Sequence, residues 1–562
     1  MDRLEHLRAL EEALNGASLD LPTPRAGSAE QIRARASRRL ADHVIPRLES
    51  VGGPLLAVVG GSTGAGKSTI VNSLVGAQVS ASSALRPTTR RPLLLHHAAD
   101  GPWFERARLL PGLARLRAAP GAPATTGAAA RAELEMRESE ALPEGVSILD
   151  APDLDSVVDS NRMLARGLFD AADLWVFVTT AARYADAVPW EVLSQAPGRD
   201  LTVAVVLNRL PRGAAADVAA DLRRLMAGAG LGEAPLFTVD EQPLASGLLP
   251  GAAVAGLRRW LEGIGADARR RAEIAHQSLT GAVREVAASV GDVEEALAEH
   301  DAALAAAADA LDTQVDRAAE RVSQATADGT LLRGEVLARW QEVVGAADFT
   351  RKLGSGVSWL RDRVSAALRG RPAPVRPVED AIEAGLASLV REELSRVRED
   401  AESAWESMPA VAGLVDAAEE EDRASLDERA LGLTREWQRD LLALVREQGA
   451  SRRAGARLMA VGVNVVGVAL MIVIFASTGG MTGAEVGVAG ATAAVAQRLL
   501  EAVFGDQAVR TMAGRARTLL LDRVRGVLEE AVRPLRERLP EPSAVADLAG
   551  RRGEVQDDWG LR

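Results

Sequence analysis

The stretch with the clearest chemistry is a glycine-rich loop that ends in a lysine and a serine. It runs from Gly61 to Ser68 and reads G-S-T-G-A-G-K-S, which fits the phosphate-loop pattern G-x-x-x-x-G-K-[ST]. Glycines let a backbone approach a phosphate closely, with its N–H groups pointing inward. Lys67 would then contact the β- and γ-phosphates, and the Ser68 hydroxyl would be a ligand of Mg²⁺. The loop therefore predicts a nucleoside triphosphate site.

Lysine usage in the rest of the chain supports this interpretation. The chain has 66 lysines and arginines together, yet only Lys67 and Lys352 are lysines. A compact ammonium on a flexible stem fits inside a phosphate cradle, whereas a planar guanidinium does not. A lysine at position 67 thus favours phosphate binding over an ordinary glycine-rich turn.

The elements around the loop are those of a parallel α/β sheet. The apolar run 55–59 predicts a buried strand before the loop, and apolar residues at helical spacing predict a helix after it. Further apolar runs, separated by helical stretches, predict strands at 93–96, 146–150, 174–178, 202–207 and 236–239. Nucleotides bind such sheets at the carboxyl ends of the strands.

Two positions beyond the loop are candidate Mg²⁺ ligands. Asp150 ends a predicted strand, where phosphate-loop enzymes place an aspartate that holds the metal. A switch loop supplies a threonine ligand between the first helix and the second strand, and Thr88 or Thr89 could fill that role. With a slight preference for Thr89, the predicted metal site consists of Ser68, Thr89 and Asp150.

Four motifs in order resemble those of translation-factor-related GTPases, and the loop is similar to that of the dynamin-like family, including its bacterial members. They read GGSTGAGKST, RPTTR, DAPD and VVLNR. The resemblance covers about 45–250 by motif and implies Mg²⁺-dependent hydrolysis of GTP by positioning and electrostatics. It implies that Ser62 and Thr63 help to place the attacking water and a charge-compensating cation. The residues expected to act in catalysis are Ser62, Thr63, Lys67 and Thr89, and those expected to bind nucleotide are Gly61, Ser62, Thr63, Gly64, Ala65, Gly66, Lys67, Ser68, Thr69, Asn208 and Arg209.

Two departures from the family pattern bear on activity. The third motif normally reads D-x-x-G, and Asp153 stands where the glycine is expected. The fourth normally ends in a carboxylate that selects guanine, and Pro211 occupies that position. Asp153 could make turnover slow. Because Pro211 cannot select guanine, GTP is expected from the resemblance alone, and ATP is the less favoured alternative.

Composition limits the other functions. The net charge of −12 argues against general nucleic-acid binding, and the absence of cysteine excludes disulfides and zinc-thiolate sites. The charged N-terminal residues lack the apolar core of a secretion signal.

Residues after 250 are helical by pattern. Leu304, Ala308, Leu311 and Val315 begin a coiled-coil-like seam. We expect N-terminal helices packing on a stalk (1–50), a GTPase domain (51–250), a helical stalk (251–454) with a basic tip (349–376), a hydrophobic membrane hairpin (455–505), a C-terminal stalk helix (506–550) and a disordered tail (551–562).

Two of these segments suggest a membrane. Leu458–Ala476 has 19 residues without a charge, which as a helix would span about 28 Å and match a bilayer core. The alternative is that the hairpin is buried inside the helix bundle. The segment 349–376 combines basic residues with Trp359, which is typical of an interfacial element but also of a solvated helix tip.

The sequence thus predicts an α/β P-loop GTPase domain plus a long all-α helical bundle with an apolar helical hairpin. The expected function is GTP-dependent membrane remodelling at the cytoplasmic face of a bacterial cell membrane, with insertion through 458–496. Pairing of GTPase heads and stalks in a homo-oligomer, or with a paralogous dynamin-like partner, follows from the resemblance. A nucleotide-sensing membrane scaffold with little hydrolysis and an ATP-specific ATPase with a helical effector domain are the alternatives.

Overall fold

The computed structural model describes residues 2–50, 52–80, 91–105, 110, 112–118, 133–153, 159–211, 215–332, 336, 338–340, 376–415, 423–450, 454–455, 458, 461–476 and 486–561. Contacts divide the chain into two compact units. The α/β unit comprises Met1–Leu19, Pro24–Glu299 and Ser543–Arg562, and the helical unit comprises Asp20–Thr23 and His300–Pro542.

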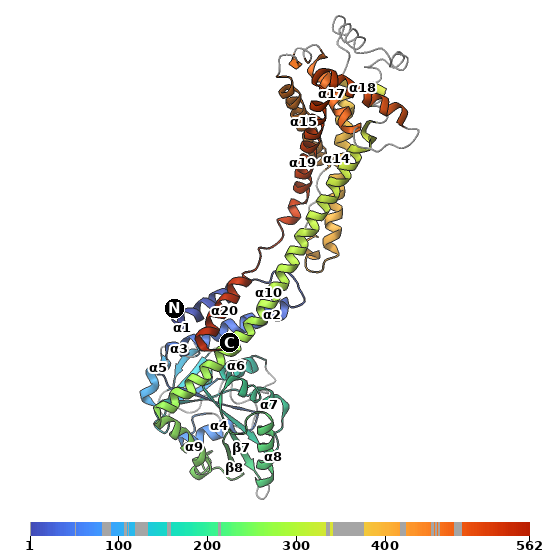
Figure 1. Cartoon of the computed structure of the whole chain (residues 1–562). Coiled ribbons are helices and arrows are strands. Elements are labelled where there is room, and N and C mark those ends of the chain that lie inside the picture. Colours follow the sequence, from blue (N-terminus) through green and yellow to red (C-terminus); the bar gives the residue numbers. More distant parts are fainter. Residues whose placement is uncertain are drawn as a thin grey trace. The chain divides into compact units, whose positions relative to one another are not determined.

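The α/β unit is built on one eight-stranded sheet, in the order β3-β4-β2-β5-β1-β6-β7-β8. Figure 1 labels its last two strands, β7 and β8. The strands are β1 (Leu55–Gly61), β2 (Leu93–His96), β3 (Ala114–Arg117), β4 (Glu133–Glu138), β5 (Val146–Asp150), β6 (Leu174–Thr180), β7 (Thr202–Leu210) and β8 (Leu236–Asp240). Only β2 and β5 pair antiparallel; the other neighbours are parallel. The six strands predicted from apolar runs are present, whereas β3 and β4 lie in a stretch whose weak pattern predicts no strand.

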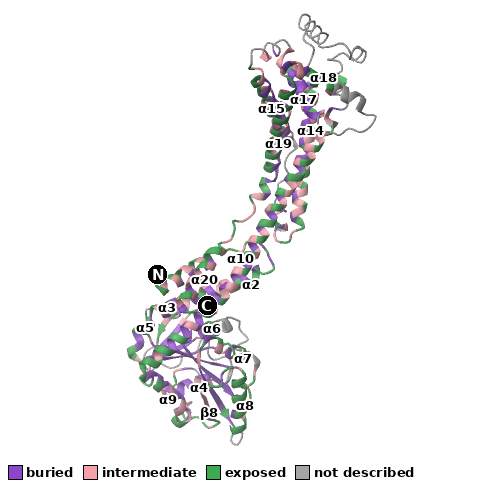
Figure 2. Ribbon diagram, viewed as in Figure 1, coloured by how far each residue is buried: buried purple, intermediate pink, exposed green. Residues whose placement is uncertain are grey.

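Strand β1 is buried along its whole length because both faces of the sheet are covered (Figure 2). Leu55, Ala57 and Val59 face one core, shared with α4 (Lys67–Val75) and α9 (Gly251–Ala266). Leu56 and Val58 face the other, shared with α6 (Asp159–Asp170), α7 (Ala187–Leu193) and α8 (Ala215–Gly228). The phosphate loop therefore leaves the sheet from a strand that is buried on both faces.

A layer of helices completes the α/β unit. It consists of α1 (Arg3–Gly16), α2 (Ala26–Arg39), the π-helical turn η1 (Leu40–Val44), α3 (Ile45–Glu49), residues up to Glu299 of α10 (Ala268–Ala327), and α20 (Val545–Trp559). Apolar side chains of α1, η1, α10 and α20 share one core, so segments from both ends of the sequence meet here.

The prediction of a disordered tail at 551–562 is wrong for most of its length, because α20 continues to Trp559. Leu548, Val555 and Trp559 form the apolar face of this helix, and Trp559 is 8% exposed. Its ring stacks on His276, with centroids 6.2 Å apart. Three apolar residues at wide spacing among many charges gave too weak a pattern to predict a helix.

The helical unit has a single continuous core. It contains the rest of α10, η4 (Thr330–Leu332), α14 (Arg376–Glu406), η5 (Ala412–Leu414), α15 (Arg423–Gln448), α17 (Val463–Ala476), α18 (Val486–Phe504) and α19 (Asp506–Arg536). The seam predicted on α10 is buried at Leu304, Leu311 and Val315, with Ala307 rather than Ala308 in the core. Two buried tryptophans connect helices through hydrogen bonds: Trp405 Nε1 donates to Ala307 O (3.0 Å) and Trp437 Nε1 to Ala516 O (2.8 Å).

The predicted membrane hairpin at 455–505 is not found. Helix α17 has 14 residues, a length of about 21 Å against a bilayer core of about 30 Å. Every residue from Val466 to Phe475 is buried in the core of the helical unit, where Phe475 packs on Trp437 with ring centroids 5.6 Å apart. Across the described residues, no helix combines the length and apolarity that a membrane crossing requires. Insertion through 458–496 is therefore unsupported, and α17 follows the alternative of burial inside the bundle. The basic tip lies outside the described residues except for Arg376, where α14 begins.

We predict that Ile472→Ala destabilises the helical unit by about 2–5 kcal/mol, because the truncation leaves a cavity among fully buried neighbours. Ile472 is 0% exposed. Chemical denaturation followed by tryptophan fluorescence measures the loss. Leu225→Ala is the control, since Leu225 is 40% exposed on α8. An unchanged unfolding midpoint for Ile472→Ala would mean that α17 does not belong to the core.

Candidate nucleotide site

The glycine-rich loop joins β1 to α4, and its glycines are required by their surroundings. Gly61, Gly64 and Gly66 have φ values of 143°, 77° and 89°. A Cβ on Gly61 would lie 2.0 Å from Val178 O, and one on Gly66 would lie 2.4 Å from the Asn208 Nδ2. Because α4 begins directly at Lys67, the unpaired N–H groups of its first turn border the loop and favour an anion there.

Lys67 is buried, with its side chain 5% exposed. Its Nζ donates to Gly61 O and Ser62 O, both at 3.1 Å, and forms an ion pair with the carboxylate of Asp153. Asp153 is the residue that stands where the third motif normally has glycine. The Asp153 carboxylate therefore pairs with the same ammonium group that would contact a triphosphate. A bound phosphate would have to displace this carboxylate from Lys67.

Asp150 and Ser68 meet at the end of β5. The Asp150 Oδ2 accepts hydrogen bonds from Ser68 Oγ (2.8 Å) and Ser80 Oγ (2.6 Å). Its other oxygen, Oδ1, is buried and has no hydrogen-bond partner in the described part of the chain. Burial raises the pKa of Asp150 above its usual value, against the opposing effect of the Ser80 and Ser68 hydroxyls.

This pair of oxygen donors fits a magnesium ion. Mg²⁺ binds proteins through one or two oxygen ligands and completes its shell with water and substrate phosphates. The unpartnered Asp150 Oδ1 and the adjacent Ser68 hydroxyl meet that requirement. No group of three or more acidic or histidine side chains suited to a metal is present among the residues that the structure describes, so Ser68 and Asp150 are the pair to which the Mg²⁺ assignment applies.

Other contacts fix the shape of the loop. Arg183, which follows β6, donates from Nη1 to Thr63 O at 2.6 Å. Ser62 is 0% exposed, and its hydroxyl has no hydrogen-bond partner among the described residues. Sequence analysis did not single out Arg183 or Ser80, because neither belongs to a recognisable motif and only the folded chain brings them to the loop.

The expected base-binding residues lie at the end of β7. Asn208 donates from Nδ2 to Ala65 O (2.9 Å), which fastens this strand end to the phosphate loop. Arg209 is exposed and takes a left-handed conformation, with φ of 55°, at an irregularity in the pairing of β7 with β8.

Carboxylates at the end of β8 lie next to Pro211. Leu210 pairs with Asp240, and Glu241 N donates to Leu210 O at 2.9 Å. Both acidic residues are exposed. Neither residue was predicted as part of the site, although a strand that ends in D-E-Q was the available signal in the sequence.

The structure thus brings Lys67, Ser68 and Asp150 together and joins Asn208 to the loop at Ala65. Thr69 lies in the first turn of α4. Thr88 and Thr89 lie outside the described residues, so the threonine ligand stays a prediction.

A largely parallel sheet in which an inner strand leads through a phosphate loop into a helix defines a P-loop nucleotide-binding domain. Residues 56–209 match the model of the Dynamin family. Over this segment the chain is similar to the dynamin family, in agreement with the resemblance of its four motifs. No protein of curated function matches the chain.

Several solved structures are similar to the chain at low sequence identity. One, of an oligomerised bacterial dynamin pair described as a mechanism for long-range sensing and tethering of membranes, has 9% identity and a TM-score of 0.39, covering 100% of this chain and 94% of the other. LeoA, a bacterial dynamin GTPase from ETEC, has 13% identity and a TM-score of 0.23, covering 99% and 97%. A chain from a structure that concerns dimerization and the GTPase activity of the chloroplast translocon components atToc33 and psToc159 has 15% identity and a TM-score of 0.23, covering 44% of this chain and 93% of the other. The family assignment depends on the match over 56–209, not on these overall likenesses.

We predict that Asp153→Asn raises the affinity for a nucleoside triphosphate about tenfold, because it removes a negative charge that competes for Lys67. Titration calorimetry of the full chain with GTP and Mg²⁺ measures the change. Asp200→Asn is the matched control: it makes the same change of charge two residues before β7 begins, away from the carboxyl ends of the strands. Equal or weaker binding by Asp153→Asn would show that the carboxylate does not compete.

Proposed function

We propose that this chain is a Mg²⁺-dependent GTPase that couples hydrolysis of GTP to binding and reshaping of lipid membranes. The observation that carries the nucleotide half is the convergence of Lys67, Ser68 and Asp150 on one glycine-rich loop at the carboxyl ends of parallel strands.

Each residue has a role in that reaction that follows from its position. The loop N–H groups and the first turn of α4 hold the phosphate oxygens. Lys67 leaves Asp153 and donates to the β- and γ-phosphates, which stabilises charge on the transferred group. Ser68 and Asp150 would hold Mg²⁺, which supplies further neutralisation of that charge. The Ser62 hydroxyl, which is buried in the same loop and has no hydrogen-bond partner among the described residues, would orient the attacking water.

Measuring phosphate release with and without vesicles that contain anionic lipid distinguishes a membrane-stimulated GTPase from a scaffold that hydrolyses little nucleotide. We expect Mg²⁺-dependent turnover that EDTA abolishes, that anionic vesicles stimulate, and that Lys67→Ala lowers at least about a hundredfold. Nucleotide binding without lipid-stimulated turnover would instead favour the scaffold alternative.

The membrane half rests on the family match and on the sequence of 349–376, where Asp362 is the only acidic residue among many arginines around Trp359. Such a segment would contact the surface of the cytoplasmic leaflet without crossing it. In the vesicle assay, Arg361→Gln with Arg363→Gln should reduce co-sedimentation, whereas Arg510→Gln with Arg515→Gln on α19 should not. Undiminished pelleting of the first pair would remove this segment from the proposal. Pairing of GTPase domains and helical units into a homo-oligomer, or with a paralogous partner, belongs to the same proposal.

We further propose that Asp240 or Glu241 supplies the carboxylate that selects guanine, since Pro211 stands at the position where the fourth motif normally has it. Guanine presents neighbouring N–H donors on one edge, which a carboxylate accepts, whereas adenine does not present that pair. Competition of GTP and ATP for a fluorescent analogue should favour GTP at least about tenfold. Asp240→Asn with Glu241→Gln should abolish the preference, and Glu233→Gln, on the turn before β8, should keep it. Equal competition by ATP in the unaltered chain would favour the ATPase alternative.

A further inference from the structure

A cavity in the α/β unit lies away from the phosphate loop. Its volume is about 520 Å³. Asp170 and Arg199 line it, and they precede β6 and β7 respectively. The cavity is therefore at the amino ends of the parallel strands, whereas the phosphate loop is at a carboxyl end.

Arginines dominate the polar lining of this cavity. They are Arg35, Arg38 and Arg39 of α2, Arg166 of α6 and Arg199 of the 3-10 turn η3 (Pro197–Arg199). Asp42, Asp170 and Glu191 are the acidic residues of the lining. His43 also lines it and is neutral, because burial lowers its pKa well below the usual value.

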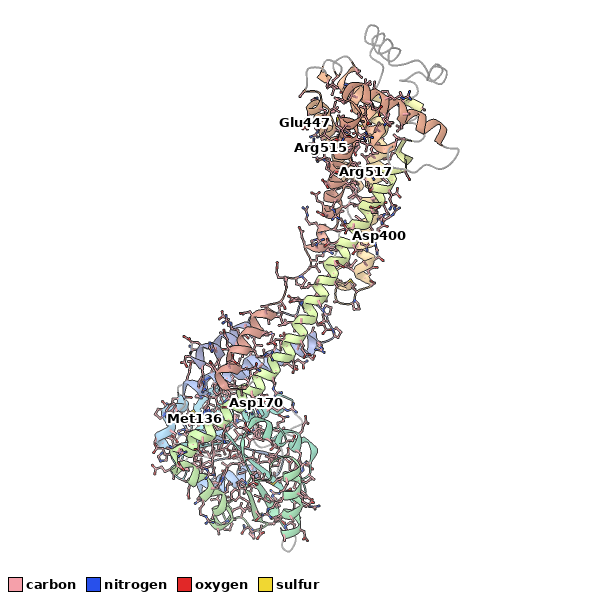
Figure 3. All side chains as sticks on the ribbon, in the orientation of Figure 1. Met136, Asp170, Asp400, Glu447, Arg515 and Arg517 are labelled. Carbon is pink, nitrogen blue, oxygen red and sulfur yellow. The ribbon has the colours of Figure 1, made fainter. Side chains whose placement is uncertain are left out.

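Three of the guanidinium groups share two carboxylates. Glu285 of α10 forms ion pairs with two of them: its Oε2 is 2.6 Å from Arg39 Nη1 and 2.8 Å from Arg199 Nε. Asp170 (labelled in Figure 3) accepts Arg199 Nη2 at 2.8 Å. Arg35 Nη2 is 3.6 Å from Glu285 and 3.7 Å from Asp170, beyond hydrogen-bond length. A guanidinium has about five N–H donors and a carboxylate accepts about four, so donors exceed acceptors here.

The arginines whose N–H donors lack acceptors include two that are almost fully buried. The side chains of Arg39 and Arg199 are 6% and 5% exposed. The Arg39 Nε has no hydrogen-bond partner among the described residues. Burial, with the nearby charge of Arg199, lowers the pKa of Arg39 to about 10, so the group is still charged at neutral pH. Buried charged donors without acceptors are costly, and an oxyanion would supply what they lack.

We propose that this cavity binds a phosphate-bearing anion, held by Arg35, Arg39 and Arg199. The planar fork of arginine matches phosphate oxygens in pairs. Leu110, Leu113, Leu164 and Val192 supply apolar walls, which suit a phosphate ester with an organic body. Because Arg35 and Arg39 belong to α2 and Arg199 to η3, the turn that precedes β7, the bound anion connects α2 to the sheet. This site is independent of the proposed GTPase activity.

The test uses the full chain with Lys67→Ala, which removes phosphate binding at the glycine-rich loop. Titration calorimetry with pyrophosphate at constant ionic strength should detect saturable binding without Mg²⁺. Arg35→Gln should weaken it about tenfold, since one charge-assisted contact is lost; Arg35 is 58% exposed, so the fold should tolerate the change. Arg199→Gln should weaken it further. Arg224→Gln, which removes the same charge from an 80% exposed side chain on α8, should leave binding unchanged.

Two sources of the phosphate are distinguished in parallel. Glycerophosphate in solution and phosphatidic acid in phosphatidylcholine vesicles present the same headgroup chemistry. Competition of pyrophosphate by glycerophosphate assigns the cavity to a soluble ester, and competition only by the vesicles assigns it to a lipid. An absence of pyrophosphate binding in Lys67→Ala, or equal weakening by Arg35→Gln and Arg224→Gln, would overturn the proposal.

Discussion

The nucleotide site depends on the interactions of the buried Lys67 ammonium. Two carbonyl oxygens of the loop and the Asp153 carboxylate surround it, so the loop is stabilised by contacts that phosphate must partly replace. A cation without acceptors would be costly at this depth. The departure at position 153 is thus not only the loss of a flexible glycine. It adds a competitor for the charge on which binding and catalysis would depend.

The sheet and the phosphate loop could be predicted because each depends on local pattern. Short apolar runs separated by helical stretches mark the strands, and glycine spacing before Lys67 marks the loop. The contacts of Ser80, Arg183 and the acidic end of β8 could not be predicted, because they arise where distant segments meet. Thr89 was predicted from motif order alone and lies outside the described residues.

Hydrophobicity misled the analysis of 458–476, and the reason is physical. A helix that is apolar on all sides suits either lipid or the centre of a helix bundle. The helical unit surrounds α17 with α15, α18 and α19, so protein side chains take the place that acyl chains would have. The length of the helix distinguishes the two environments better than its hydrophobicity does. Helix α17 is shorter than the charge-free stretch that contains it, because Gly462, with φ of 93°, interrupts the helix before Val463.

The closing of the α/β unit by α1 and α20 has a consequence for biosynthesis. His6 and Asp558 form a contact across 552 positions of sequence. At ribosomal rates, α1 is made on the order of a minute before its final neighbour leaves the exit tunnel. During that interval part of its leucine stripe lacks its native cover. The core that α1 shares with α20 is therefore complete only after the residues up to Trp559 have been made.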